Sequence, residues 1–188
     1  MGDVWDRIMA WLRINAPEVL DNLRSGAMQD DIRATEAALG VAFPNDVTAS
    51  YLLHDGQGYY SPPLMGSWQL LSLASIVNQW EIMRDIPPDE EPHDADDPNN
   101  PVRPDWWNPR WVPVAYDGGG DLCCVDLDPA PNGIVGQMTI FWHTDEERER
   151  FALSFRDWLS SYADDLEQGK YVVHRENEIT TIERIDDR

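Results

Sequence analysis

Apolar side chains recur at helical spacing in the first third of the chain. Trp5, Ile8 and Leu12 lie three and four positions apart, which predicts a helix over residues 3–15, and Pro17 suits the first turn of a second, short helix. Similar spacing, with capping residues before it or glycines after it, predicts further helices that begin near residues 29, 44, 72 and 154. We therefore expect the N-terminal third to be helical.

Runs rich in β-branched and aromatic residues predict strands in the middle of the chain. They cover residues 68–71, 111–115, 122–127 and 134–142. Turn-rich segments separate the last three, which we expect to pair as an antiparallel meander. From Tyr171 onward, alternating isoleucines at positions 179, 182 and 185 allow either a final strand or a free tail.

The composition indicates one folded domain. The chain has 188 residues, 42% of them hydrophobic and nine of them tryptophan, which suits one core and would be cramped for two. Prolines and like charges from about residue 85 to residue 105 predict an exposed acidic loop. We expect a single domain over residues 1–188, with that loop as an insertion and a C-terminal tail from about residue 172.

The net charge of the chain says more about its binding partners than about its fold. Thirty-five acidic residues against 14 basic ones give a formal net charge of −21. Such a field repels nucleic acid and anionic membranes and attracts a basic protein. No run approaches the roughly 18 apolar residues of a membrane span, and the first residues do not resemble a signal peptide, so we expect a cytoplasmic protein.

The segment from Asp117 to Asp121 combines two carboxylates with three glycines and could be a ligand loop or a turn. As a calcium loop it fails, because Gly119, Leu122 and Asp128 stand where an oxygen ligand, a glycine and a glutamate are needed. A strand rather than a helix follows, so no helix N-terminus is available for a phosphate group. We interpret the segment as a tight hairpin turn, with a ligand contact as the alternative.

Other candidate chemistry has weak support. The four histidines are scattered, and Cys123 and Cys124 have no basic neighbour, which favours buried thiols over a metal site or a nucleophile. Asp126 and Asp128 could act as an acid–base pair or hold a metal, although 35 acidic residues make such pairs common by chance. We therefore expect no metal and no cofactor.

Trp106, Trp107 and Trp111 form an aromatic cluster in the sequence. The cluster could stack on a sugar or a base, or it could cover an edge of the core. Because the negative charge disfavours nucleic acid as a stacking partner, we favour core cover.

Several short motifs occur in an informative order. They are Asp31-Ile-x-x-x-Glu36-x-x-Leu-Gly40-x-x-Phe-Pro44-x-Asp46, Ser50-Tyr51-x-x-His-Asp-Gly56, Leu70-Leu-Ser-Leu73, Trp111-Val-Pro-Val-Ala-x-Asp117-Gly-Gly-Gly-Asp and Ser154-Phe-x-x-Trp-Leu159. With these motifs the chain resembles the SMI1/KNR4 family, also called the SUKH superfamily, over about residues 5 to 172. The acidic loop and the tail depart from the family pattern.

The resemblance implies an α+β fold, a largely antiparallel sheet packed with N-terminal and C-terminal helices, and no enzymatic activity. Bacterial members are similar to immunity proteins of polymorphic toxin systems, and fungal members to a cell-wall-synthesis regulator. Together with the negative charge, this predicts an immunity protein that neutralises a cognate toxin, itself a basic domain acting on nucleic acid. A regulatory scaffold is the alternative, and a metal-dependent hydrolase using Asp126 and Asp128 is a third hypothesis.

Polar residues on segments expected to be exposed are the predicted partner contacts. They lie in the segment after the fourth helix, in the acidic loop and in the glycine turn. The residues are His54, Asp55, Tyr59, Tyr60, Asp89, Glu90, Glu91, Asp94, Asp96, Asp97, Asp117 and Asp121.

Overall fold

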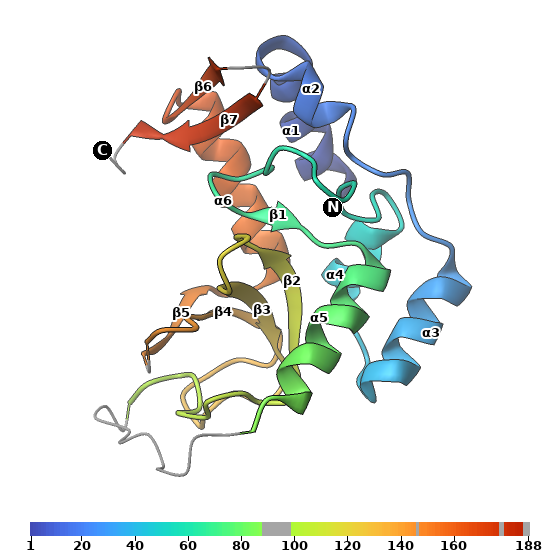
Figure 1. The fold of residues 1–188 in the computed structure, drawn as a ribbon, viewed down its shortest axis with the longest axis vertical. Helices are drawn as coiled ribbons and strands as arrows, with labels where there is room; N and C mark the ends of the chain where they lie inside the picture. The colour runs from blue at the N-terminus through green and yellow to red at the C-terminus, as the bar shows by residue number, and fades with distance from the viewer. Residues whose placement is uncertain (88–98, 146, 177–178, 186–188) are drawn as a thin grey trace.

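The fold combines helices with two antiparallel sheets (Figure 1). A computed structural model describes residues 1–87, 99–145, 147–176 and 179–185. The helices are α1 (Gly2–Asn15), α2 (Pro17–Leu20), α3 (Gln29–Leu39), α4 (Asn45–Tyr51), α5 (Leu73–Asp85) and α6 (Phe155–Glu167). The strands are β1 (Gln69–Leu70), β2 (Trp111–Tyr116), β3 (Leu122–Asp126), β4 (Gln137–Phe141), β5 (Arg148–Ala152), β6 (Tyr171–Glu176) and β7 (Ile179–Arg184).

Strands β1 to β5 form one sheet in sequence order, and each pairs antiparallel with the next. The predicted meander is confirmed for β2, β3 and β4, with Val112 opposite Val125 and Val125 opposite Met138. Strands β6 and β7 form a separate hairpin, so the segment from Tyr171 is neither a single strand nor a free tail. The α+β fold class expected from the sequence is confirmed.

The larger core lies between one face of the five-stranded sheet and the helices. Val112, Val125 and Met138 pack there with apolar side chains from α1, α5 and α6. The predicted apolar stripe of α1 is buried, and Trp5 in that stripe is 0% exposed. Its indole Nε1 donates a hydrogen bond to Ser50 Oγ on α4 at 2.8 Å, so the buried polar atom is satisfied.

The opposite face of the sheet carries a smaller core, which residues 99–110 cover. The rings of Trp106 and Trp107 meet Phe141 of β4 edge-on, with centroids 5.3 and 5.6 Å away. Such edge-to-face pairs contribute about 0.5–1.5 kcal/mol each beyond the area they bury. The prediction that these tryptophans cover the core is therefore confirmed.

The two cysteines occupy opposite faces of β3, because successive side chains of a strand alternate. Cys124 belongs to the smaller core, whereas Cys123 lines a pocket on the helical side. Both are buried free thiols, and burial raises the pKa of each well above its ordinary value. The expectation of buried thiols is confirmed.

Strand β5 is missing from the predicted elements because its sequence is largely charged. Arg148, at its start, is only 3% exposed. Its guanidinium donates hydrogen bonds to the carbonyl oxygens of Trp106 and Asp145 at 3.1 and 2.6 Å and lies 4.6 Å from the Phe141 ring. A buried arginine that donates to main-chain oxygens has the same sequence signature as an exposed one, so sequence patterns do not reveal this strand.

One boundary expectation was wrong. The strand expected over residues 134–142 begins only at Gln137, because Gly136 turns the chain with a φ of 92°. In the segment expected as an exposed loop over about residues 85–105, the described residues 85–87, 99, 103 and 104 are exposed, whereas Val102 is packed and only 1% exposed. Asn100 holds the chain near Val102 in place by donating a hydrogen bond to the Arg148 carbonyl oxygen at 2.7 Å.

Candidate partner-binding surface

The segment after α4 begins with two residues that the fold uses internally. The His54 ring packs on Trp5 with centroids 4.7 Å apart, and its Nδ1 lies 3.1 Å from the Arg24 carbonyl oxygen. Burial lowers the His54 pKa, which favours the neutral ring. Asp55 accepts a hydrogen bond from the Leu73 backbone N–H at 2.8 Å and pairs with Arg24 at 3.1 Å. Both residues were expected to be exposed contacts, but they mainly anchor α5 and the chain around Arg24.

Gly56 and Gln57 fix the path of the chain beyond this point. Gly56 has a φ of 62°, and a Cβ there would lie 2.4 Å from the Leu71 carbonyl group, so only glycine fits. The Gln57 side chain is buried, and its Oε1 accepts hydrogen bonds from the backbone N–H groups of Leu64 and Leu70 at 3.1 and 3.0 Å. The chain that follows Gln57 is therefore held in place by hydrogen bonds to Leu64 and to Leu70 of β1.

We call residues 57–61 the tyrosine loop. Gln69 of β1 supports it by donating from Nε2 to the Gly58 carbonyl oxygen at 2.6 Å. Tyr59 and Tyr60 point into solvent from this base, 80% and 91% exposed, with ring centroids 4.3 Å apart and edge-on. Tyr60 has a φ of 65°, a left-handed conformation that is uncommon for a residue other than glycine. A fixed loop thus displays two exposed aromatic rings at the cost of backbone strain.

The segment 117–121 is a hairpin turn between β2 and β3, as the sequence predicts. Asp117 Oδ1 accepts hydrogen bonds from the backbone N–H groups of Gly119, Gly120 and Asp121 at 2.8, 3.0 and 2.9 Å. Asp121 Oδ1 in turn accepts from the backbone N–H of His143 at 2.9 Å. Both carboxylates are half-buried and remain within reach of a partner, so their role as contacts stays a prediction.

The sheet register brings two of the predicted contact segments together. Gln69, which supports the tyrosine loop, pairs with Tyr116 on β2, and Asp117 follows directly. The tyrosine loop and the glycine turn therefore lie at the same end of the sheet. The other predicted contacts, Asp89, Glu90, Glu91, Asp94, Asp96 and Asp97, lie outside the described residues.

Asp126 and Asp128 have structural contacts that the sequence did not reveal. Asp126 is 0% exposed and accepts hydrogen bonds from the Asp128 backbone N–H and from Gln137 Nε2, both at 2.9 Å. Burial raises the Asp126 pKa. Asp128 pairs with Arg103 at 3.1 Å and accepts from Asn108 at 3.1 Å. The pair ties residues 99–110 to the sheet.

Two findings concern the described part of the chain as a whole. Within it, no group of three or more histidine, cysteine, aspartate or glutamate side chains is arranged to hold a metal ion. No helix in the same residues has the length and apolar character needed to cross a membrane.

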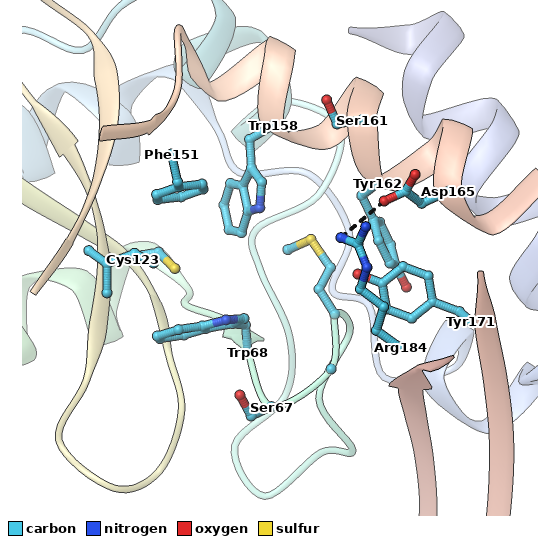
Figure 2. Close-up of a pocket in the computed structure, with 13 residues that line it drawn as sticks. Ser67, Trp68, Cys123, Phe151, Trp158, Ser161, Tyr162, Asp165, Tyr171 and Arg184 are labelled. Carbon is cyan, nitrogen blue, oxygen red and sulfur yellow. Dashed lines mark ion pairs between the residues drawn. The ribbon is translucent and has the colours of Figure 1, made fainter. Parts of the chain in front are cut away.

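A pocket beside α6 was not predicted from the sequence. Its walls come from four separate places, including Trp68 before β1, Phe151 of β5 and Trp158 of α6 (Figure 2). Trp158 lies four residues after the capping Ser154, three after Phe155, so helical spacing alone would place it on the inward face; periodicity cannot distinguish a residue that fills a core from one that lines a space. Only the packing of distant segments could have indicated this pocket.

These features define an α+β domain with a five-stranded antiparallel sheet, a separate two-stranded hairpin, and an aromatic loop at one end of the larger sheet. The family model described as SMI1 / KNR4 family (SUKH-1) matches residues 26–161. The chain therefore belongs to the SMI1/KNR4 family, as its motifs indicate.

Curated relatives include fungal regulators. The chain is 26% identical to the "Glucan synthesis regulatory protein" of Neurospora crassa over 90% of this chain and 39% of that protein. It is also 26% identical to the "Cell wall assembly regulator SMI1" of Saccharomyces cerevisiae, over 93% of this chain and 42% of that protein. A shorter similarity, 36% over 66 residues, links it to the human "F-box only protein 3". The chain spans about two fifths of the length of these fungal relatives.

Proposed function

We propose that this chain is a non-enzymatic protein-binding domain whose contact surface centres on the tyrosine loop. The observation that carries the proposal is the exposed pair Tyr59 and Tyr60 on a loop held in place by Gln57 and Gln69. Tyrosine is enriched among the residues that dominate binding energy, because its ring offers a large contact area with little rotamer freedom to lose. A fixed loop also loses little entropy on binding, which favours affinity.

The partner that fits this domain is basic. A net charge of −21 attracts a positively charged surface from a distance and speeds encounter. Association rate constants then approach about 10⁸–10⁹ M⁻¹ s⁻¹ at low salt, against about 10⁵–10⁶ M⁻¹ s⁻¹ without such steering. We expect the association rate to fall at least about tenfold when salt is raised from about 20 to 500 mM, because salt shortens the range of these forces. An association rate that does not depend on salt would contradict a basic partner.

The finer proposal is that the partner is a toxin and the chain its immunity protein. Membership of the SMI1/KNR4 family, whose bacterial members resemble immunity proteins, and the negative charge support it, since an acidic inhibitor suits a basic domain that acts on nucleic acid. The test is expression of the product of the neighbouring gene, which we expect to be the toxin, with and without this protein. Survival only in the presence of this protein is expected, and equal killing in both cultures would contradict the immunity role.

The same culture assay can test the tyrosine loop. A double variant, Tyr59→Ser with Tyr60→Asn, removes both rings, and asparagine tolerates the left-handed backbone at the second position. We expect this variant to lose protection. Met28→Ser, which removes another exposed apolar side chain, 71% exposed on a different segment, is the matched control and should protect fully. Full protection by the double variant would remove the loop from the contact surface.

A regulatory scaffold is the second candidate function. The observation that favours it is the similarity, over at least 90% of this chain, to fungal proteins named as regulators of cell-wall or glucan synthesis. A scaffold should bind several cellular proteins in cells that contain no toxin. Affinity purification followed by mass spectrometry is expected to recover a set of partners lost in the double variant. Recovery of no specific partner from such cells would favour the immunity role instead.

A further inference from the structure

A pocket of about 410 Å³ lies between the sheet, α6, residues 65–68 and the β6–β7 hairpin. Figure 2 shows Phe151, Trp158 and Trp68 around one end of the space, with Tyr171, Arg184 and Asp165 at the other. Protein interiors are otherwise close-packed, and wall atoms beside a space lose contacts. The volume lies within the range of about 300–1,000 Å³ that is typical of ligand sites.

The charged end of the pocket argues for a neutral occupant. Asp165 is paired twice, with Lys170 at 2.7 Å and with Arg184 at 3.3 Å. The Arg184 guanidinium beside the space disfavours a cation, and the net charge of −21 disfavours an anion. Nucleotides, phosphorylated groups and amines are therefore poor candidates.

The apolar part of the wall favours an aromatic ring over a sugar, although Ser67 and Ser161 also line the space. Met65, Cys123 and Ile140 line the space with side chains that offer weak hydrogen bonds or none. Sugar hydroxyl groups facing them would lose their hydrogen bonds to water without replacement. An aromatic ring could instead meet Trp68 and Trp158 edge-to-face, and the flexible Met65 side chain could adapt around it.

We propose that this pocket receives an aromatic side chain from the protein partner. The inference rests on the proposed function, since it names the anchor by which that partner is held. Trp68 of the pocket wall is next to Gln69, which donates hydrogen bonds to the Gly58 carbonyl oxygen and Ser61 Oγ of the tyrosine loop at 2.6 and 3.2 Å, so an anchored side chain would lie near the surface that Tyr59 and Tyr60 present. Aromatic anchors that fill a pocket, ringed by weaker contacts, are the usual source of binding energy in protein interfaces.

The test uses the whole chain and N-acetyl-phenylalaninamide, a neutral, blocked residue that carries the proposed ring. Nuclear magnetic resonance of the ¹⁵N-labelled protein reports each tryptophan N–H, and Trp68→Phe and Trp158→Phe variants assign the two pocket signals. We expect saturable shifts of those two signals with this probe and none with N-acetyl-serinamide or maltose. Shifts caused by maltose, or no shift with the aromatic probe up to the limit of its solubility, would overturn the proposal.

Two variants keep the test decisive. Trp158→Ala removes a wall and should abolish the response of the Trp68 signal, and the remaining tryptophan signals report whether it is folded. Ile140→Phe fills the space instead, removes no buried wall, and should weaken the response at least fivefold. Ile14→Ala, at a position 82% exposed and outside the pocket, should respond as the wild type does. An unaltered response in Ile140→Phe would sink the proposal even if Trp158→Ala failed to fold.

The pocket and the proposed function can fail separately. The probe titration needs no partner, so a saturable response would support the pocket even if no protein partner bound the chain. Conversely, if folded Trp158→Ala binds the partner as tightly as the wild type does, the pocket does not hold a side chain of the partner, although the domain still binds a protein.

Discussion

Substitutions at Tyr60 separate the role of its backbone from that of its ring. With φ at 65°, the residue occupies a conformation that costs a residue with a Cβ roughly 1–2 kcal/mol. Glycine avoids that strain but loses about 0.5–1 kcal/mol through the greater freedom of the unfolded chain. The ring is 91% exposed, and alanine and glycine both remove it, so its contribution cancels in their comparison. We therefore expect Tyr60→Gly to be about 0.5–1 kcal/mol more stable than Tyr60→Ala.

Thermal or urea denaturation can measure this difference. For a domain of this size, 1 kcal/mol corresponds to a shift of about 2–4 °C in Tm. Ala37→Gly, at an exposed position inside α3, is the matched control and should lose about 1 kcal/mol because the backbone there is helical. An alanine variant at position 60 that equals or exceeds the glycine variant in stability would refute the argument that the tyrosine loop is strained.

Three further predictions concern the residues that build this end of the sheet. Gly56→Ala should lower the free energy of unfolding by at least about 2 kcal/mol more than Gly40→Ala does. Both glycines have a positive φ, but only at Gly56 would an added Cβ lie 2.4 Å from a carbonyl group, that of Leu71. Equal losses of stability in urea denaturation would contradict this prediction. Asp117→Ala removes the acceptor of three backbone hydrogen bonds and should lower the free energy of unfolding by about 1–3 kcal/mol in the same assay. Asp30→Ala, on the surface, is the control and should lower it by less than about 0.5 kcal/mol. Burial raises the Asp126 pKa in the folded protein. The stability of the wild type relative to Asp126→Asn should therefore fall as pH rises from the pKa of the unfolded chain, about 3.9, toward the higher pKa of the folded protein. A stability difference that does not depend on pH would refute this prediction.

The helices and the meander were predictable because their signals are local. Helix α6 shows this well: Ser154 caps it by accepting from the Asp157 backbone N–H at 3.0 Å, as the spacing of the two residues predicts. Ser72 caps α5 in the same way at 3.2 Å. Each signal lies within a few residues of the element that it specifies, so one sequence is enough to recognise it.

The features that were missed depend on contacts between distant segments. Arg148 reads as a surface residue until the carbonyl oxygen of Trp106 is found 3.1 Å from its guanidinium. Asp126 reads as a possible acid–base group until Gln137 is found beside it. Among the predicted contacts, Tyr59 and Tyr60 are exposed as expected, whereas Asp55 caps a helix and Asp117 closes a turn. Polarity alone could not separate these cases, because carboxylates serve turns and helix ends as readily as interfaces.

The proposed function requires that this domain binds a basic protein through the tyrosine loop. Surface plasmon resonance with the toxin domain or the recovered cellular partner, comparing wild type, the Tyr59→Ser and Tyr60→Asn double variant, and Met28→Ser, tests it most directly. We expect a dissociation constant at least about 30-fold weaker for the double variant, equivalent to about 2 kcal/mol, and no change for Met28→Ser. Equal affinities for all three proteins would contradict it.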